Sequence, residues 1–265
     1  MNPIELSEYM SVTITLVVLT IASISDLRTR EVTDKLWLVY GPVGLALTVY
    51  RTLLEPQTLL FTAISIGLSI LLAFAVVFFG LSGGADAKAL ICLGLTLPLP
   101  PSILSPVLGF GYPFFPLVVF ITAYIASLSV VVWMLAKNLI LFSKIRSGIF
   151  EGLQREPTWK KCLAFITGYP TKTSLLRSTF SLYPMEKVVE DMDGVRRAFQ
   201  VYSNADVDRE QLLTEFDESM KQVGSPSTIW VTPGLPLLVF MLVGVVIVLT
   251  VGDPIFGWIA SLAMR

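Results

Sequence analysis

Long apolar stretches alternate with short polar segments along this chain, and six of the stretches are long enough to cross a lipid bilayer. A helix needs about 20 mostly apolar residues to span the hydrocarbon core, with about 17 as a lower limit. In chain order the stretches are Tyr9–Ser25, Leu36–Leu54, Thr58–Gly80, Ala87–Leu108, Leu117–Leu141 and Pro233–Trp258. The pattern predicts an all-α polytopic membrane protein with six transmembrane helices.

The fourth stretch contains helix-breaking residues. Pro98, Pro100 and Pro101 lack the backbone N–H that a helix interior requires. We therefore expect a short helix, followed by a loop rich in glycine and proline that extends to Pro116.

A polar region separates the fifth and sixth stretches. Lys144–Ser225 holds most of the charge of the chain, and its two signs balance. It is predicted to be a soluble α+β insertion of residues 144–225, between a membrane core of residues 1–143 and a final part of residues 226–265. We expect a strand near residues 198–202. A helix that ends near Gly224 is predicted by the spacing of Leu212, Leu213, Phe216, Met220 and Val223.

Composition agrees with the membrane class and excludes several kinds of chemistry. Hydrophobic residues make up 54% of the chain, charged residues 15%, and the net charge is −1 with no basic block. Nucleic-acid binding is therefore not indicated. The chain has no histidine, which excludes Ser-His-Asp triads and HExxH zinc sites. Cys92 and Cys162 form no metal-binding spacing, so we predict neither a metal nor a cofactor.

Basic residues near the ends of the stretches predict the orientation. If the six spans alternate, one side receives almost all of these residues, and that side should be the cytoplasm. Both termini would then lie outside, and the insertion would be cytoplasmic. The residues that set this orientation are Arg28, Arg30, Lys35, Lys88, Lys137, Lys144 and Arg146.

Two aspartates stand at the ends of charge-free stretches on this predicted cytoplasmic face. Asp26 follows the first stretch, and Asp86 follows the third in the segment Gly83-Gly84-Ala85-Asp86-Ala87-Lys88. Two carboxyls that share a site cannot both ionise at low cost, so one keeps a proton while the other acts as a base. The two glycines would let a substrate backbone approach. Spacing alone does not decide between two interpretations of Asp26 and Asp86, a catalytic pair or two ordinary acids in interfacial loops.

The surroundings of both aspartates resemble a known family. Asp26-x-Arg28-x-Arg30-x-Val32 and Gly83–Lys88 look like the motifs of archaeal preflagellin and prepilin peptidases, in the type IV prepilin peptidase family of GxGD intramembrane aspartyl proteases. The resemblance implies that Asp26 and Asp86 are catalytic and that the GxGD glycines fall on Gly83 and Ala85. It also implies removal of a short basic leader from archaellin or pilin-like precursors at the cytoplasmic face.

Two further segments carry weaker hypotheses about substrate binding. Pro233-Gly234-Leu235-Pro236 is similar to the Pro-Ala-Leu motif of presenilin-type proteases, which implies a role in substrate positioning, although prolines also mark helix starts. Glu31 and Asp34 could attract a basic leader, or they could be ordinary loop acids.

Three other functions stay open at this point. A presenilin-like enzyme would cut inside a substrate span instead of at its edge. A proton-coupled transporter would exchange protons at the two aspartates, although such carriers usually have repeated halves. A membrane anchor would only present the insertion to a partner. The predicted partners are a leader-bearing protein substrate and the lipid bilayer, without an expectation for the oligomeric state.

Overall fold

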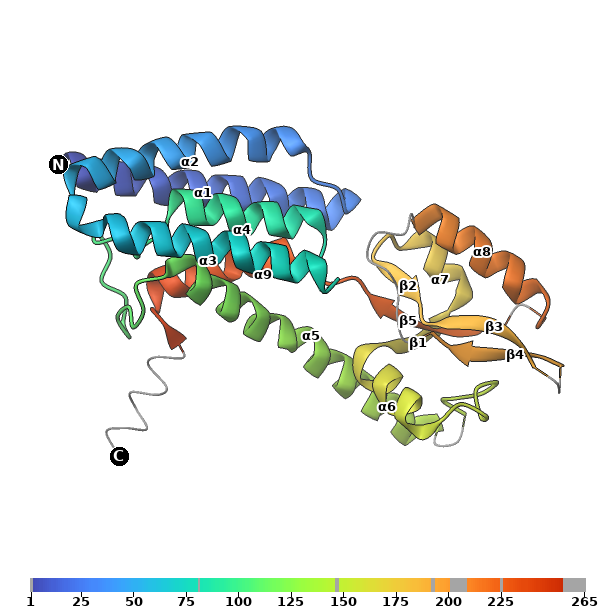
Figure 1. Cartoon of the computed structure of the whole chain (residues 1–265). Coiled ribbons are helices and arrows are strands. Elements are labelled where there is room, and N and C mark those ends of the chain that lie inside the picture. Colours follow the sequence, from blue (N-terminus) through green and yellow to red (C-terminus); the bar gives the residue numbers. More distant parts are fainter. Residues whose placement is uncertain are drawn as a thin grey trace, which may run out of the picture. The chain divides into compact units, whose positions relative to one another are not determined.

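The computed structural model describes residues 2–80, 82–145, 148–191, 194–200, 209–224 and 226–254. The chain divides into two compact units (Figure 1). The helical unit consists of Met1–Ser127 and Pro236–Arg265, and the α/β unit consists of Leu128–Leu235. One long helix, α5 (Phe115–Ile145), contributes to both units.

The helical unit contains long apolar helices together with two shorter ones. Among the described residues, four helices are long and apolar enough to cross a membrane, which indicates a membrane protein. They are α1 (Pro3–Thr29), α2 (Asp34–Leu54), α3 (Leu59–Phe78) with the preceding 3-10 turn η1 (Pro56–Thr58), and α5. The shorter helices are α4 (Gly84–Thr96) and α9 (Leu237–Thr250).

The two short helices correspond to the fourth and sixth predicted stretches. Helix α4 ends at Thr96, just before Pro98, as the prolines predict. Helix α9 begins at Leu237 instead of Pro233, because Pro233 belongs to a strand and Pro236 stands at the N-cap. The predicted end of this stretch, Trp258, lies outside the described residues.

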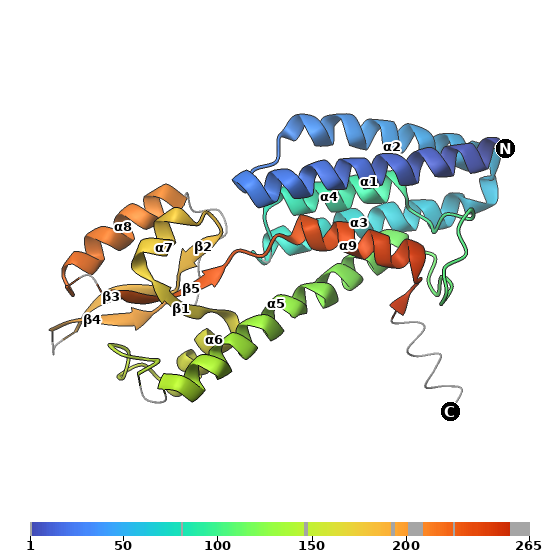
Figure 2. The same cartoon turned by 180° about the vertical axis from the view of Figure 1, so that it is seen from behind.

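Helix α4 lies between α2 and α3, while α1 packs against α2 and α9 (Figures 1 and 2). Small residues allow these close crossings, as is common between membrane helices. A side chain at Gly44 of α2 would overlap Thr96 of α4, and one at Gly94 of α4 would overlap Ser69 of α3. Hydroxyl groups also join the helices, since Thr48 Oγ1 donates to the Thr96 carbonyl at 3.2 Å. These contacts fix α4 against both neighbours.

The α/β unit contains two small antiparallel sheets. One sheet has the order β1-β5-β2, with β1 (Tyr169–Lys172), β2 (Leu182–Pro184) and β5 (Thr228–Pro233). The other pairs β3 (Glu186–Asp191) with β4 (Gly194–Phe199), so that Val189 lies opposite Arg196. Besides the end of α5, the described helices of this unit are α6 (Thr158–Thr167), α7 (Thr173–Ser178) and α8 (Arg209–Lys221). The prediction of a small region that combines helices and strands is thus confirmed.

Helix α8 closes one core of this unit. Leu213, Phe216 and Met220 are buried and join a cluster with Ile229 and Val231 of β5. These three positions recur every three to four residues, which places them on one helix face. The predicted helix is therefore present, and it buries the face that its apolar spacing indicated.

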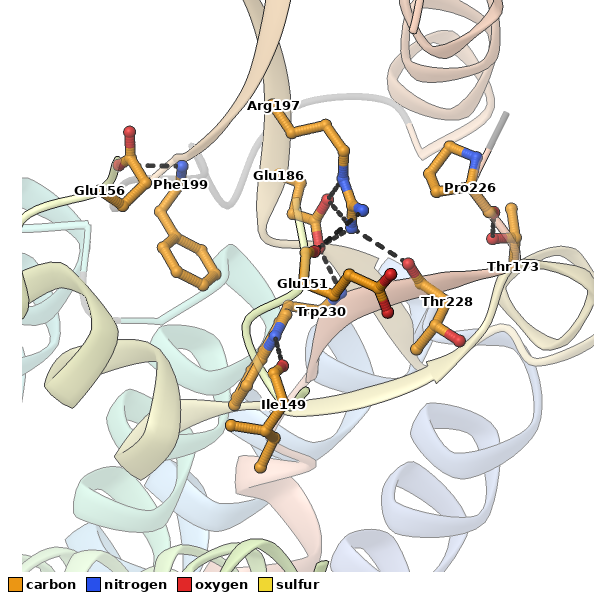
Figure 3. Close-up of polar contacts among 10 residues, drawn as sticks. All are labelled: Ile149, Glu151, Glu156, Thr173, Glu186, Arg197, Phe199, Pro226, Thr228 and Trp230. Atoms are coloured by element: carbon orange, nitrogen blue, oxygen red, sulfur yellow. Dashed lines mark hydrogen bonds and ion pairs between the residues drawn. The ribbon is translucent and has the colours of Figure 1, made fainter. Parts of the chain in front are cut away.

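A buried ion pair connects the strands of the two sheets (Figure 3). Arg197 Nε and Nη2 donate to the two carboxylate oxygens of Glu186 at 2.7 and 2.8 Å, and Nη2 also donates to the Thr228 carbonyl at 3.0 Å. Glu186 accepts a further bond from the backbone N–H of Trp230 at 2.7 Å. The indole N–H of Trp230 donates to the Ile149 carbonyl at 3.1 Å. The network ties β3, β4 and β5 to the segment before α6.

Glu156 gives the α/β unit a predicted dependence on pH. Burial opposes ionisation of its carboxyl, but hydrogen bonds from Arg196, Lys160 and the Phe199 backbone N–H outweigh it and hold its pKa below the usual value. A lowered folded-state pKa contributes stability above the unfolded value of about 4.3, and this contribution is lost as the pH falls through the folded-state pKa.

We therefore expect Glu156→Gln to lower the free energy of unfolding by about 2 kcal/mol at neutral pH, the range for hydrogen bonds to charged groups. At a pH below the folded-state pKa the difference from wild type should shrink. Urea unfolding of the full chain in detergent, at neutral pH and at a pH below the folded-state pKa, measures this difference in the free energy of unfolding. An equal difference at both values would contradict the role of the ionised carboxylate.

Candidate active site

Asp26 lies in the last turn of α1. The helix continues past the apolar stretch to Thr29, and the backbone N–H of Arg30 donates to the Asp26 carbonyl at 3.1 Å. Arg30 ends the helix with a φ of 59°, in the left-handed region that terminates many helices. The Asp26 side chain is 14% exposed. Its carboxyl is therefore held on a helix and is largely covered.

Arg30 brings a positive charge to this carboxyl. Its Nη1 lies 3.9 Å from Asp26 Oδ1, and its charge also acts on Asp86. In the sequence, Arg30 is a signal of membrane orientation and a residue of the family motif, and no contact with Asp26 was expected from either. The separation of four residues at the end of one helix is the signal that could have indicated the contact, because residues so spaced lie on the same side of a helix.

Asp86 is the third residue of α4. Its carboxylate accepts a hydrogen bond from the backbone N–H of Gly83, the N-cap residue. A negative charge is favoured at a helix N-terminus. The charge of Asp26 acts on Asp86, so these two acids, which are far apart in the sequence, lie within reach of one another's charge in the helical unit.

Open space lies beside Asp86. A Cβ atom added at Gly83 or Gly84 would meet no described atom within 4 Å, and Gly83 has an ordinary φ of −77°. Neither packing nor backbone geometry therefore requires a glycine at these two positions. Ala85, which takes the place of a GxGD glycine if the resemblance holds, is helical and needs no positive φ, since Arg30 alone among the described non-glycine residues has one.

Two family models match the chain in succession. The model of the type IV leader peptidase family matches residues 13–135, which include both aspartates and the glycines. The model of the archaeal peptidase A24 C-terminus, type II, matches residues 160–254. The chain belongs to the type IV leader peptidase family.

Curated relatives agree with this membership of the leader peptidase family. The preflagellin peptidase of Methanococcus maripaludis strain C6 is 25% identical over 248 residues, which are 91% of this chain and 94% of the relative. That of Methanococcus voltae is 25% identical over 245 residues, covering 90% and 94%. That of Methanocaldococcus jannaschii is 26% identical over 246 residues, covering 90% and 92%. None of these matches supports the transporter alternative.

Tyr124 is a further residue near Asp86 in this leader peptidase family member, and no pattern in the sequence pointed to it. It lies on α5, its ring contacts that of Phe120 with centroids 4.5 Å apart, and it interacts electrostatically with Asp86. Its hydroxyl is buried and has no hydrogen-bond partner among the described residues. A buried hydroxyl usually has a partner, so this group is available to a bound molecule.

The acids of the loop between α1 and α2 differ in their contacts. Asp34 is exposed at the start of α2 and pairs with Lys88, whose Nζ lies 2.5 Å from its Oδ1. Lys88 thus contacts Asp34, although it follows Asp86 by two residues in the sequence. Glu31 is exposed.

Pro233, Gly234 and Leu235 belong to the α/β unit, whereas both aspartates belong to the helical unit. Pro233 is the last residue of β5 and lies opposite Leu182. The backbone N–H of Gly234 donates to the Ser181 carbonyl at 2.7 Å, and Leu235 is exposed.

The charged groups of the candidate site are few. Nowhere in the described part of the chain do three or more Asp, Glu, Cys or His side chains gather in a way that could hold a metal ion. The site offers two carboxyls, one guanidinium and one phenol hydroxyl. These groups are suited to moving a proton and to donating hydrogen bonds.

Proposed function

We propose that this chain is a membrane-embedded aspartyl endopeptidase that removes the short basic leader of an archaellin or pilin-like precursor. The observation that supports it most is that the charge of Asp26 acts on Asp86, on a separate helix, next to the open space at Gly83 and Gly84. Membership of the leader peptidase family and the preflagellin peptidase relatives support this activity.

The two carboxyls would divide the acid and base roles. One ionised carboxylate takes a proton from water, which attacks the scissile carbonyl, and the protonated partner donates a hydrogen bond to the developing oxyanion. The proton then passes to the leaving amine. Arg30 would keep the net charge of the pair low while the proton moves.

We place the reaction at the cytoplasmic face. In this arrangement α4 and α9 complete six spans, both termini lie outside and the α/β unit is cytoplasmic. The basic residues near Asp26 and Asp86, among them Arg28 and Lys88, support this orientation. Precursors would present their leaders on the same side.

Glu31 is the better candidate for attracting a basic leader. Asp34 already pairs with Lys88, so its charge is partly balanced, whereas Glu31 is exposed close to the end of α1. We assign Asp34 a secondary role in attracting the leader. Pro233, Gly234 and Leu235 are proposed to position the substrate, and this proposal rests on the presenilin-like motif alone.

The direct test is to co-express the chain with a precursor that carries a basic leader before a hydrophobic segment. N-terminal sequencing of the precursor should then give a new terminus just before the hydrophobic segment. A terminus inside that segment would point to a presenilin-like enzyme. An intact precursor, with the chain present in the membrane, would contradict the proposal.

Tyr124→Phe should lower kcat for leader cleavage about 10-fold or more and leave KM nearly unchanged. The change removes only the buried hydroxyl, and a hydrogen-bond donor at a reacting group acts mainly in the transition state. Tyr50→Phe is the matched control, because Tyr50 is exposed on α2. Processing rates over a range of precursor concentrations separate the two parameters. A wild-type kcat would show that the hydroxyl does not contact the reacting groups.

A further inference from the structure

Helix α6 is fixed to the end of α5 by one buried side chain. The Nδ2 group of Asn138 donates to the carbonyls of Phe165 and Gly168 at 2.8 and 2.6 Å. These carbonyls lie at the C-terminal end of α6, and Asn138 is fully buried. Asn138 precedes Lys144, the end of the apolar span, by less than two helical turns. The C-terminal end of α6 therefore lies beside the last part of a candidate membrane span.

The two faces of α6 differ in character. Ala164 is buried in a cluster with Leu153 and Trp230, which attaches α6 to the rest of the α/β unit. Trp159 and Ile166 are instead 59% and 41% exposed. A short helix with an exposed tryptophan and lysines beside an apolar face is typical of a helix that lies in a membrane interface.

A groove of about 570 Å³ separates α6 from the end of α5. Its walls are almost wholly carbon, and Lys161 stands beside it with its Nζ donating to the Gln154 carbonyl at 2.7 Å. The volume lies within the range of small-molecule sites. The apolar residues that line it include Leu139 and Phe142 of α5, and Cys162, Phe165 and Ile166 of α6.

The groove is continuous with the surface of α5 that would face lipid. Leu139 and Phe142 belong to the apolar span and are 59% and 47% exposed, and the same two side chains form one wall of the groove. Hydrocarbon that covers this side of α5 would thus extend into the groove without crossing a polar barrier. Water would find almost no hydrogen-bond partner there.

With α5 in the membrane as proposed above, we infer that the groove binds the hydrocarbon tail of a lipid from the cytoplasmic leaflet. Helix α6 then lies in the interface, and the α/β unit is held at the membrane surface by the bound lipid as well as by its chain connections. No metal, nucleotide or peptide is needed to cover the apolar walls.

Cys162 provides the test, because it is exposed and lines the groove, whereas Cys92 is buried. A nitroxide label on Cys162 of the full chain in liposomes is examined for collision with oxygen, which enters lipid, and with a polar nickel chelate, which does not. Two controls carry a single label in a Cys162→Ser chain. Val132→Cys reports the exposed lipid side of α5, and Ser178→Cys reports the exposed surface of α7.

We expect the label at Cys162 to resemble the label at Val132→Cys, with oxygen collisions favoured over nickel collisions by roughly 10-fold relative to Ser178→Cys. If the label at Cys162 collided with nickel as often as the label at Ser178→Cys, while the label at Val132→Cys lay in lipid, only the groove site would be overturned. Protection from both reagents would indicate a bound peptide and would also overturn it. A nickel-accessible label at Val132→Cys would contradict the membrane placement itself.

Discussion

We expect Asp26→Asn and Asp86→Asn each to abolish cleavage of a leader-bearing precursor, with a loss of at least about 1,000-fold in rate. Each change keeps the shape of the side chain but removes the group that exchanges a proton, and general acid–base catalysis contributes about 10² to 10⁴ to a rate. The two losses should not add, because either carboxyl without the other cannot divide the acid and base roles. The measurement is the fraction of precursor processed over time in membranes that contain equal amounts of each variant.

Asp217→Asn is the matched control for these variants. It is the same chemical change in α8, where Asp217 pairs with Arg177 at the surface of the α/β unit. Processing by this variant should stay close to wild type. If Asp26→Asn or Asp86→Asn also processed the precursor at the wild-type rate, the aspartyl mechanism would be wrong, even though the family membership would remain.

The second large effect concerns folding. Glu186→Gln should lower the free energy of unfolding by about 3–5 kcal/mol, because it leaves the largely buried guanidinium of Arg197 without its counter-charge. Domains are usually stable by about 5–15 kcal/mol, so much of the stability of the α/β unit would be lost. Proteolysis of the full chain in detergent over a urea series gives the free energy of unfolding of this unit.

Arg177→Gln provides the comparison for that experiment. The ion pair between Arg177 and Asp217 is mostly exposed, with 69% of the Arg177 side chain open to solvent. Exposed pairs contribute about 0–1 kcal/mol, so this variant should unfold almost as the wild type does. Equal losses in the two variants would mean that burial of the Glu186 carboxylate does not determine the stability of the unit.

The positions of the long helices were predictable because local patterns determine them. Apolar stretches give the helices of the membrane class, and Pro98 gives the end of α4. The motifs around Asp26 and Asp86 give the family, which the matching models confirm. Each of these features depends on residues close together in the chain.

The contacts that depend on distant residues were not predictable from such patterns. Pro233 pairs with Leu182 in a sheet, and no local signal distinguishes that strand from the start of the following helix. Tyr124 comes close to Asp86 only because α4 and α5 belong to the same helical core. The apolar spacing of α8, in contrast, identified its buried face because the relevant residues lie within four turns.

The tight crossings of α4 at Gly44 and Gly94 have a consequence for the proposed enzyme. A helix held on two sides cannot slide along its axis, so Asp86 would stay at one depth relative to the bilayer. The catalytic carboxyl would then meet every substrate at the same distance from the centre of the bilayer. Precursors with unrelated leaders would all be cut at the same height above their own hydrophobic segments, and the membrane itself would define the point of cleavage.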